Sequence, residues 1–213
     1  MPRDSANLFY VTALGIYFAA IRDPVSGTIP LKLYSFSDNY PGTQQLWATV
    51  EERDGLGDGL VADFFTHVKE GGFYGWPYAY IGPHEEPRIP ETERRKNLVA
   101  KTITPDILLE PHCAVLDFLF YTGQQFPAEY RSGAFLANHG SQNRADRVGY
   151  SISFVPFKNG KPSGPVRDFA TGWMLGPDQK EVWGRPVGLL QLHDGSMLIS
   201  DDGGKVVWHV SFR

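Results

Sequence analysis

Charged side chains lie on turns that directly follow predicted strands at several places in this chain, and such turns can hold a charged ligand. The segment Glu52–Gly55 (ERDG) follows the apolar run Leu46–Val50. An arginine there can face an anionic ligand, and carboxylate or carbonyl oxygens are the donors that calcium prefers. A charged turn in solvent explains the same residue types, so ligand binding needs support from other segments.

Two further arginines have similar surroundings. Arg144 ends the segment Asn138–Arg144 (NHGSQNR), which contains His139 and lies between two predicted strands. Arg185 lies in Trp183–Gly188 (WGRPVG), at the start of the last group of strands. A guanidinium group matches the planar geometry of a carboxylate, so both arginines are candidates for binding an anionic ligand. The alternatives are a hairpin turn at His139 and a structural salt bridge at Arg185.

Three other features have structural interpretations. A lone histidine such as His112 is more often a structural or surface residue than a ligand. Cys113 is the only cysteine, so no intrachain disulfide can form, and its apolar surroundings predict a small buried side chain. The turn Gly71–Pro77 (GGFYGWP) holds two aromatic residues between glycines, which indicates close packing of the backbone rather than catalysis.

The composition indicates a folded protein without a nucleic-acid partner. The 213 residues are 42% hydrophobic and 14% aromatic, enough for a sizeable core in one large domain or two small ones. The formal net charge is −4, and the basic cluster Arg94–Lys96 lies among acidic residues, which excludes a surface that displaces counterions from phosphates. The apolar run of residues 8–21 is too short for a membrane span and predicts a buried strand pair or a signal-peptide core.

The 23 glycines and 16 prolines divide the chain into short segments typical of an all-β protein. The predicted strands are Leu46–Val50, Leu116–Tyr121, Ala134–Ala137, Tyr150–Pro156, Val187–Leu192, Ser196–Ser200 and Lys205–Ser211. The last three, joined by short turns rich in aspartate and glycine, form an up-down-up meander like one blade of a β-propeller. A looser meander runs from residue 113 to residue 157. A generic antiparallel sandwich is the alternative fold.

Two segments do not follow the strand pattern. Asp58–Glu70 has apolar residues at helical spacing, which predicts a short helix or an ordered loop. Gly82–Pro105 is polar and proline-rich without periodicity, so we expect a long surface loop of the kind that borders a ligand site. The aspartate-glycine turns near the C-terminus lack the spacing of an EF-hand, so turn chemistry explains them better than calcium binding.

The motifs in Leu46–Asp54, Gly71–Pro77, Asn138–Arg144 and Trp183–Gly188 resemble those of the soluble quinoprotein sugar dehydrogenases, the glucose/sorbosone dehydrogenase family. The resemblance implies a six-bladed β-propeller that holds pyrroloquinoline quinone (PQQ) and calcium. It covers the C-terminal half of a family member, which corresponds to roughly two to three blades. We therefore divide the chain into a poorly matching segment, residues 1–39, and a propeller-like region, residues 40–213.

The resemblance assigns expected roles to individual residues. It implies that PQQ is contacted by Arg53, His112, Arg144 and Arg185, and that calcium is bound by the backbone carbonyls of Asp54 and Gly55. In the family, PQQ accepts a hydride from the anomeric carbon of a sugar, so the expected activity is that of a PQQ-dependent dehydrogenase for an aldose, pyranose or sorbosone-type sugar. The electron acceptor and the location are unknown. The resemblance implies a secreted or periplasmic protein, but the sequence shows no convincing signal peptide.

The sequence also departs from the family pattern. The family's catalytic base is a histidine in an earlier blade, and none of the six histidines of this chain lies in a matching context. Arg22-Asp23-Pro24 is only faintly similar to the family's Arg-Asn-Pro cofactor motif. The alternatives are therefore a catalytically incompetent propeller remnant or a sugar-binding module. Because so few blades cannot close a ring, their unpaired edges predict self-association.

Overall fold

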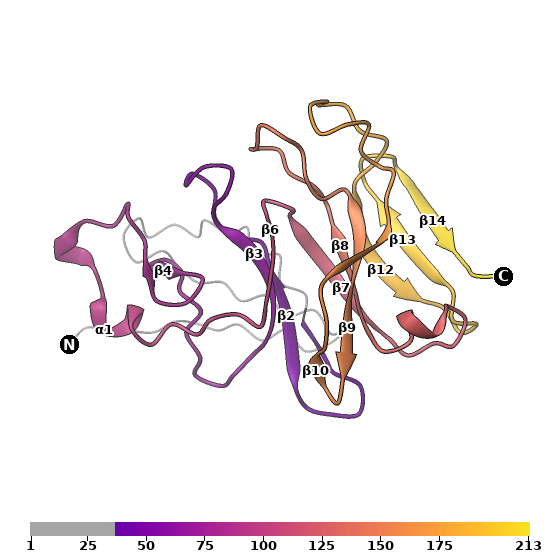
Figure 1. The fold of residues 1–213 in the computed structure, drawn as a ribbon, viewed down its shortest axis with the longest axis horizontal. Helices are drawn as coiled ribbons and strands as arrows, with labels where there is room; N and C mark the ends of the chain where they lie inside the picture. The colour runs from indigo at the N-terminus through magenta and orange to yellow at the C-terminus, as the bar shows by residue number, and fades with distance from the viewer. Residues whose placement is uncertain (1–36) are drawn as a thin grey trace.

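The computed structural model describes residues 37–213, which form three main antiparallel sheets placed side by side (Figure 1). The predicted features of residues 8–21 and of Arg22-Asp23-Pro24 lie outside the described residues, and the boundary after residue 39 stays a prediction. No helix within residues 37–213 is long and apolar enough to cross a membrane. Strands are the main regular secondary structure of residues 37–213, as the spacing of glycine and proline predicted.

The first sheet has the strand order β1-β2-β3-β6. Its strands are β1 (Ser37–Asn39), β2 (Leu46–Val50), β3 (Ala62–His67) and β6 (Ile107–Pro111). The expected helix within Asp58–Glu70 is wrong, because that segment contributes β3, which pairs with β2 and β6. Nearly all side chains of β3 are buried, including the polar Asp63 and Thr66. Polar and apolar residues therefore do not alternate regularly along the strand, and the apolar ones mimic helical spacing.

The second sheet has the order β10-β9-β8-β7, with β11 also pairing with β9. The strands are β7 (Val115–Tyr121), β8 (Gly133–Asn138), β9 (Ser151–Lys158), β10 (Lys161–Pro162) and β11 (Arg167–Ala170), and the short 3-10 helix η2 (Ala128–Tyr130) lies between β7 and β8. The antiparallel pairing of β7, β8 and β9 confirms the looser of the two predicted meanders.

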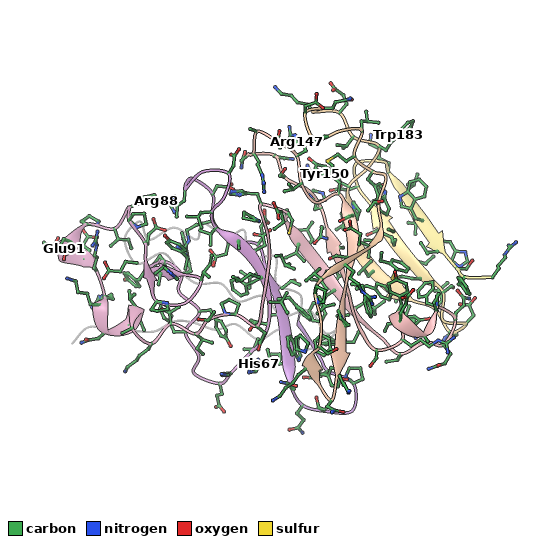
Figure 2. The ribbon with its side chains drawn as sticks, in the orientation of Figure 1. His67, Arg88, Glu91, Arg147, Tyr150 and Trp183 are labelled. Carbon is green, nitrogen blue, oxygen red and sulfur yellow. The ribbon has the colours of Figure 1, made fainter. Side chains whose placement is uncertain are left out.

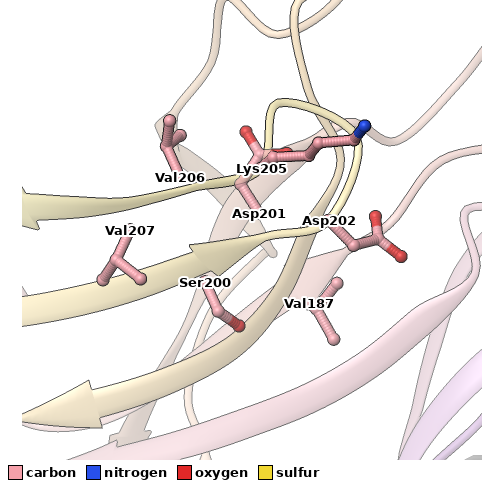
Figure 3. A pocket seen from close by; sticks show the side chains of 7 residues that line it. All are labelled: Val187, Ser200, Asp201, Asp202, Lys205, Val206 and Val207. Atoms are coloured by element: carbon pink, nitrogen blue, oxygen red, sulfur yellow. The ribbon is translucent and has the colours of Figure 1, made fainter.

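The third sheet consists of β12 (Pro186–Gln191), β13 (Met197–Asp201) and β14 (Val206–Val210) in that order. It confirms the predicted C-terminal meander. Its outer face is exposed and carries a hollow of about 350 Å³, lined in part by Val187, Ser200 and Val207 (Figure 3).

Two apolar cores fill the spaces between the sheets, and β8 contributes to both. Ala134 and Leu136 pack in the core shared with the first sheet. Phe135 and Ala137 pack in the core shared with the third sheet. Because successive side chains of a strand point to opposite faces, this alternation covers the middle sheet on both sides.

A long excursion between β3 and β6 extends from the first sheet. It contains the two-stranded ribbon β4 (Ala79–Tyr80) and β5 (His84–Glu85), the 3-10 helix η1 (Glu91–Glu93) and the short helix α1 (Lys96–Val99). The predicted loop Gly82–Pro105 therefore carries short elements of its own. Figure 2 shows Arg88 and Glu91 of this excursion at the opposite end of the molecule from Trp183.

The glycine turn that begins this excursion has the structural role that its sequence indicated. Gly75 has a φ of +117°, and a Cβ at this position would lie 2.4 Å from the carbonyl oxygen of Ala79. The backbone of the turn therefore folds back on itself at a distance that only glycine permits.

Candidate functional site

A cavity of about 250 Å³ opens where turns from all three sheets converge. The first sheet contributes Asp54 from the turn after β2, and the second contributes His112 and residues 139–143 from the turns beside β7 and β8. The third contributes Arg185, directly before β12, and Asp202, directly after β13. The fold thus brings together three of the predicted site residues, although they are far apart in sequence.

The carboxylate of Asp54 joins two of these turns. Its Oδ1 lies 3.0 Å from Nδ1 of His112, and its Oδ2 accepts a hydrogen bond from Nδ2 of Asn143 at 2.7 Å. The other ring nitrogen of His112, Nε2, lies 3.0 Å from the carbonyl oxygen of Gly57. Both ring nitrogens of His112 therefore face oxygen atoms of the chain, and the ring holds the rim of the cavity together.

The buried carboxyl group of Asp63 holds the backbone of the turn after β2 and of the turn before β7. Asp63 on β3 is fully buried and accepts hydrogen bonds from the amide groups of Glu52 at 2.8 Å and of Ala114 at 2.7 Å. Burial raises the pKa of Asp63 to about 7, although these two hydrogen bonds favour the carboxylate. Sequence reasoning missed this residue, because a single aspartate within an apolar run belongs to no motif.

Cys113 is buried, as its apolar surroundings predicted. Its Sγ lies 3.4 Å from Oδ2 of Asp63. Burial, with the nearby charge of Asp63, raises the pKa of the thiol well above its usual value, so the thiolate that a nucleophile needs is disfavoured.

The side chain of Arg185 joins the third sheet to the second. Its Nε donates to the carbonyl oxygen of His139 at 3.2 Å, and its Nη2 donates to that of Gly140 at 2.6 Å. Its guanidinium carbon lies 5.5 Å from the centre of the Tyr150 ring. The third nitrogen, Nη1, has no hydrogen-bond partner among residues 37–213. Arg185 therefore retains one donor nitrogen for a ligand.

Arg53 does not line the cavity. Its Nη1 donates to Oε2 of Glu86 at 2.9 Å, its Nη2 donates to the carbonyl oxygen of Ala79 at 2.7 Å, and its guanidinium lies 4.6 Å from the centre of the Trp76 ring. Burial alone would raise the pKa of Glu86, but hydrogen bonds from Arg88 and Arg53 lower it overall. These contacts anchor the turn after β2 to the excursion, and the predicted cofactor contact of Arg53 stays a prediction.

Gly55 and Arg144 also lie outside the lining. Nη1 of Arg144 donates to Oε1 of Glu110 at 2.8 Å. Nη1 of Arg88 donates to the carbonyl oxygen of Asp54 at 2.8 Å, and a Cβ on Gly55 would lie 2.8 Å from the same nitrogen. A cation of the chain therefore already lies beside the carbonyl groups that were predicted to bind calcium. Residues 37–213 contain no group of three or more His, Cys, Asp or Glu that could hold a metal ion.

Residues 86–212 match the model of the TrAA12-like family. This match covers more than half of the chain, so the chain belongs to the TrAA12-like family. It includes the segments that contribute His112, residues 139–143, Arg185 and Asp202 to the cavity.

Individual relatives are similar to this chain over part of their length. An uncharacterised protein of Borreliella burgdorferi is 31% identical over 180 residues, which are 83% of this chain and 46% of that protein. The pyrroloquinoline quinone-dependent pyranose dehydrogenase of Coprinopsis cinerea is 31% identical over 124 residues, which are 50% of this chain and 16% of that protein. The calcium structure of the Trichoderma reesei protein of carbohydrate-active enzyme family AA12 superposes with a TM-score of 0.62 at 20% identity, over 77% of this chain and 48% of that one.

These matches confirm the predicted quinoprotein sugar dehydrogenase relationship and the predicted fold, an all-β chain that forms part of a β-propeller. The chain spans about half the length of the Borreliella protein and of the Trichoderma structure.

Proposed function

We propose that this protein oxidises a hydroxyl group of a sugar, with PQQ as the electron acceptor. The observation that carries the proposal is the convergence of turns from three sheets on one cavity that contains the unpaired Nη1 of Arg185, in a chain of the TrAA12-like family. The Coprinopsis relative is described as a PQQ-dependent pyranose dehydrogenase, which supports a pyranose as the class of substrate.

Arg185 is the residue that best fits PQQ, a flat quinone with three carboxylate groups. A guanidinium binds a carboxylate through charge-assisted hydrogen bonds, and the backbone contacts of Arg185 hold this guanidinium in place before a ligand arrives. Four acidic residues also line the cavity and would repel an anionic ligand, so its favourable charged contact falls on the arginine; they are Glu51, Glu52, Asp54 and Asp202. When bound, PQQ would supply the two-electron redox chemistry, and the chain would orient the reactants.

His112 has a supporting role in this proposal. Since both of its ring nitrogens contact the chain, it positions Asp54 and the turn before β7 and offers no free nitrogen to a ligand. Calcium has weaker support, because Arg88 already donates to the carbonyl oxygen of Asp54. We therefore assign no step of the reaction to calcium.

The first test is a fluorescence titration of the purified chain with PQQ, in the presence and absence of calcium. Replacing Arg185 by alanine should weaken PQQ binding by roughly tenfold to a hundredfold, the loss expected for a hydrogen bond between charged groups. The matched control is Arg95→Ala, because Arg95 is exposed and lies in the excursion, outside the lining of the cavity. Equal PQQ affinity of the wild type and the Arg185 variant would contradict the assignment.

A dye-reduction assay with a panel of aldoses tests the reaction itself. Sugar-dependent reduction that requires PQQ supports the dehydrogenase. If the chain binds saccharides without PQQ and reduces no dye, it is a sugar-binding module. If it binds neither PQQ nor sugars, it is a propeller remnant without this activity.

A further inference from the structure

Asp201 is the last residue of β13 and precedes the turn that contributes Asp202 to the cavity (Figure 3). It is only 3% exposed. Its Oδ1 accepts hydrogen bonds from the amide groups of Arg185 and Gly204, both at 2.7 Å. Its Oδ2 accepts a hydrogen bond from Nε1 of Trp208 at 2.9 Å. A single buried carboxylate therefore holds the backbone of Arg185 against the turn after β13.

These hydrogen bonds keep the carboxyl group of Asp201 ionised at neutral pH. Burial alone would raise its pKa, but the hydrogen bonds from Gly204, Arg185 and Trp208 lower the pKa overall. A buried carboxylate without donors would be costly in free energy. The carboxylate and the amide group of Arg185 therefore hold each other in place.

Two glycines allow the segment before β12 to lie close to the turn after β13. A Cβ at Gly184 would overlap Oδ2 of Asp201. A Cβ at Gly203 would lie 2.8 Å from Cγ of Arg185. Only glycine permits such an approach, so the backbone on both sides of the Asp201 carboxylate is closely confined.

The guanidinium end of Arg185 is held as well. Its hydrogen bonds to the carbonyl oxygens of His139 and Gly140 and its contact with the Tyr150 ring fix it in the lining of the cavity. Asp201 holds the other end of the residue, at the backbone amide. A long side chain that is held at both ends has lost much of its freedom before a ligand arrives, which lowers the entropy cost of binding.

We propose that Asp201 is a positioning residue for the ligand site and that it acts by holding the backbone of Arg185. Asp201 does not line the cavity itself, so its effect on a ligand passes through the arginine. The identity of the ligand, a quinone that carries carboxylates, rests on the proposed function. The position of the arginine does not rest on it and can be measured without PQQ.

NMR of the arginine side chains tests the positioning in the chain without PQQ. In the chain labelled with ¹⁵N, the Nε–H group of Arg185 should exchange with water more slowly than that of the exposed Arg95, because it donates to the carbonyl oxygen of His139. Asp201→Ala should raise this exchange rate toward that of Arg95. A wild-type Nε–H group that exchanges as fast as that of Arg95, or an unchanged rate in Asp201→Ala, would overturn the proposal.

Titration with PQQ gives the second measurement. Asp201→Ala should weaken PQQ binding by roughly threefold to tenfold, the loss expected when one long side chain must be ordered on binding. Electrostatics alone predicts the opposite sign, because the substitution removes a negative charge near an anionic ligand. Gly184→Ala should also weaken binding, since its Cβ would displace the carboxylate of Asp201, and it serves as the test if Asp201→Ala does not fold. Unchanged or tighter binding in either variant would contradict the positioning.

Two comparisons separate positioning from a loss of stability. Ile199→Val shortens a buried side chain of the same strand, so it should lower the urea midpoint of unfolding without changing the PQQ affinity. In a chain that already carries Arg185→Ala, Asp201→Ala should weaken PQQ binding no further, because the arginine that it positions is absent. An equal loss of affinity with and without Arg185 would show that Asp201 supports the fold only.

The outcomes distinguish this proposal from the proposed function. If the wild type binds no PQQ, the proposed function fails, and the exchange rates alone decide whether Asp201 positions Arg185. If the wild type binds PQQ and Asp201→Ala leaves the affinity unchanged, the positioning role fails and PQQ binding remains supported.

Discussion

At the scale of single residues, the buried carboxyl group of Asp63 can change its protonation state while it holds two turns beside the cavity. Its carboxyl group accepts amide hydrogen bonds from both sides, and its pKa in the folded chain is about 7. The pKa of an aspartate in an unfolded chain is about 3.9. The stability that depends on protonated Asp63 is therefore fully present below about pH 4 and is lost as the pH rises through about 7.

Replacing Asp63 by asparagine should remove this pH dependence. The free energy of unfolding of the wild type should fall between about pH 4 and about pH 7. That of the variant should stay nearly constant between about pH 6 and about pH 7, because asparagine does not titrate. The variant should lose about 1–3 kcal/mol at low pH, because asparagine offers one acceptor oxygen to two amide groups. Urea unfolding at a series of pH values, followed by tryptophan fluorescence, measures both effects.

Asp117 provides a matched control for this experiment. It is also buried, it accepts a hydrogen bond from the amide group of Leu189 at 2.7 Å, and burial raises its pKa to about 6. In Asp117→Asn, the free energy of unfolding should therefore depend less on pH below about pH 6. Its decrease between about pH 6 and about pH 7 should remain, because Asp63 is unchanged. If the free energy of unfolding falls equally between about pH 6 and about pH 7 in the wild type and in Asp63→Asn, Asp63 does not titrate in that range.

At the scale of elements, prediction from the sequence succeeded where turn residues mark the strand ends. The aspartate-glycine turns around β13 predicted the third sheet, and the apolar runs predicted β2 and β7. Prediction failed at β3, because a strand buried on both faces shows no alternation of polar and apolar residues. Periodicity alone cannot distinguish such a strand from a buried helix.

The candidate site could be predicted only in part for a similar reason. The motifs around Asp54, His112 and Arg185 marked turns that the structure does bring to one cavity. The partners of these side chains depend on which strands pair, and Asp63 lies 51 residues from its partner Ala114. Such contacts leave no local pattern in the sequence.

The alternation of β8 makes a prediction about the aromatic core on one of its faces. Phe135 is fully buried, and its ring lies 4.5 Å from that of Phe169 and 5.0 Å from that of Phe154, measured between ring centres. Phe135→Ala should destabilise the fold by about 3–5 kcal/mol, because it removes a buried ring and leaves a cavity. The measurement is urea unfolding at one pH.

The control for this variant is Trp183→Ala. The Trp183 side chain is exposed, so its removal should change the free energy of unfolding by no more than about 0.5 kcal/mol. A cost below about 1 kcal/mol for Phe135→Ala would mean that the core on this face of β8 contributes little to stability.

At the scale of the whole molecule, the three sheets differ in how their faces are covered. The middle sheet is packed on both faces, whereas the third sheet buries Met197 and Ile199 on its inner face and exposes its outer face. Val207 pairs with Ser200 on the outer face and is 63% exposed. Leu190 pairs with Leu198 and is also exposed. An apolar face of this kind favours association with another protein surface, and we propose a second copy of the chain as the partner.

Val207→Glu should therefore weaken self-association without unfolding the chain, because the side chain is exposed and the added charge remains in solvent when the chain is a monomer. In sedimentation velocity over a range of concentrations, the wild type should show a rising sedimentation coefficient, and the variant should remain a monomer. Leu175→Glu introduces the same charge at an exposed position between β11 and β12 and should behave as the wild type. A wild type that stays monomeric at every concentration, or equal effects of the two variants, would contradict association through this face.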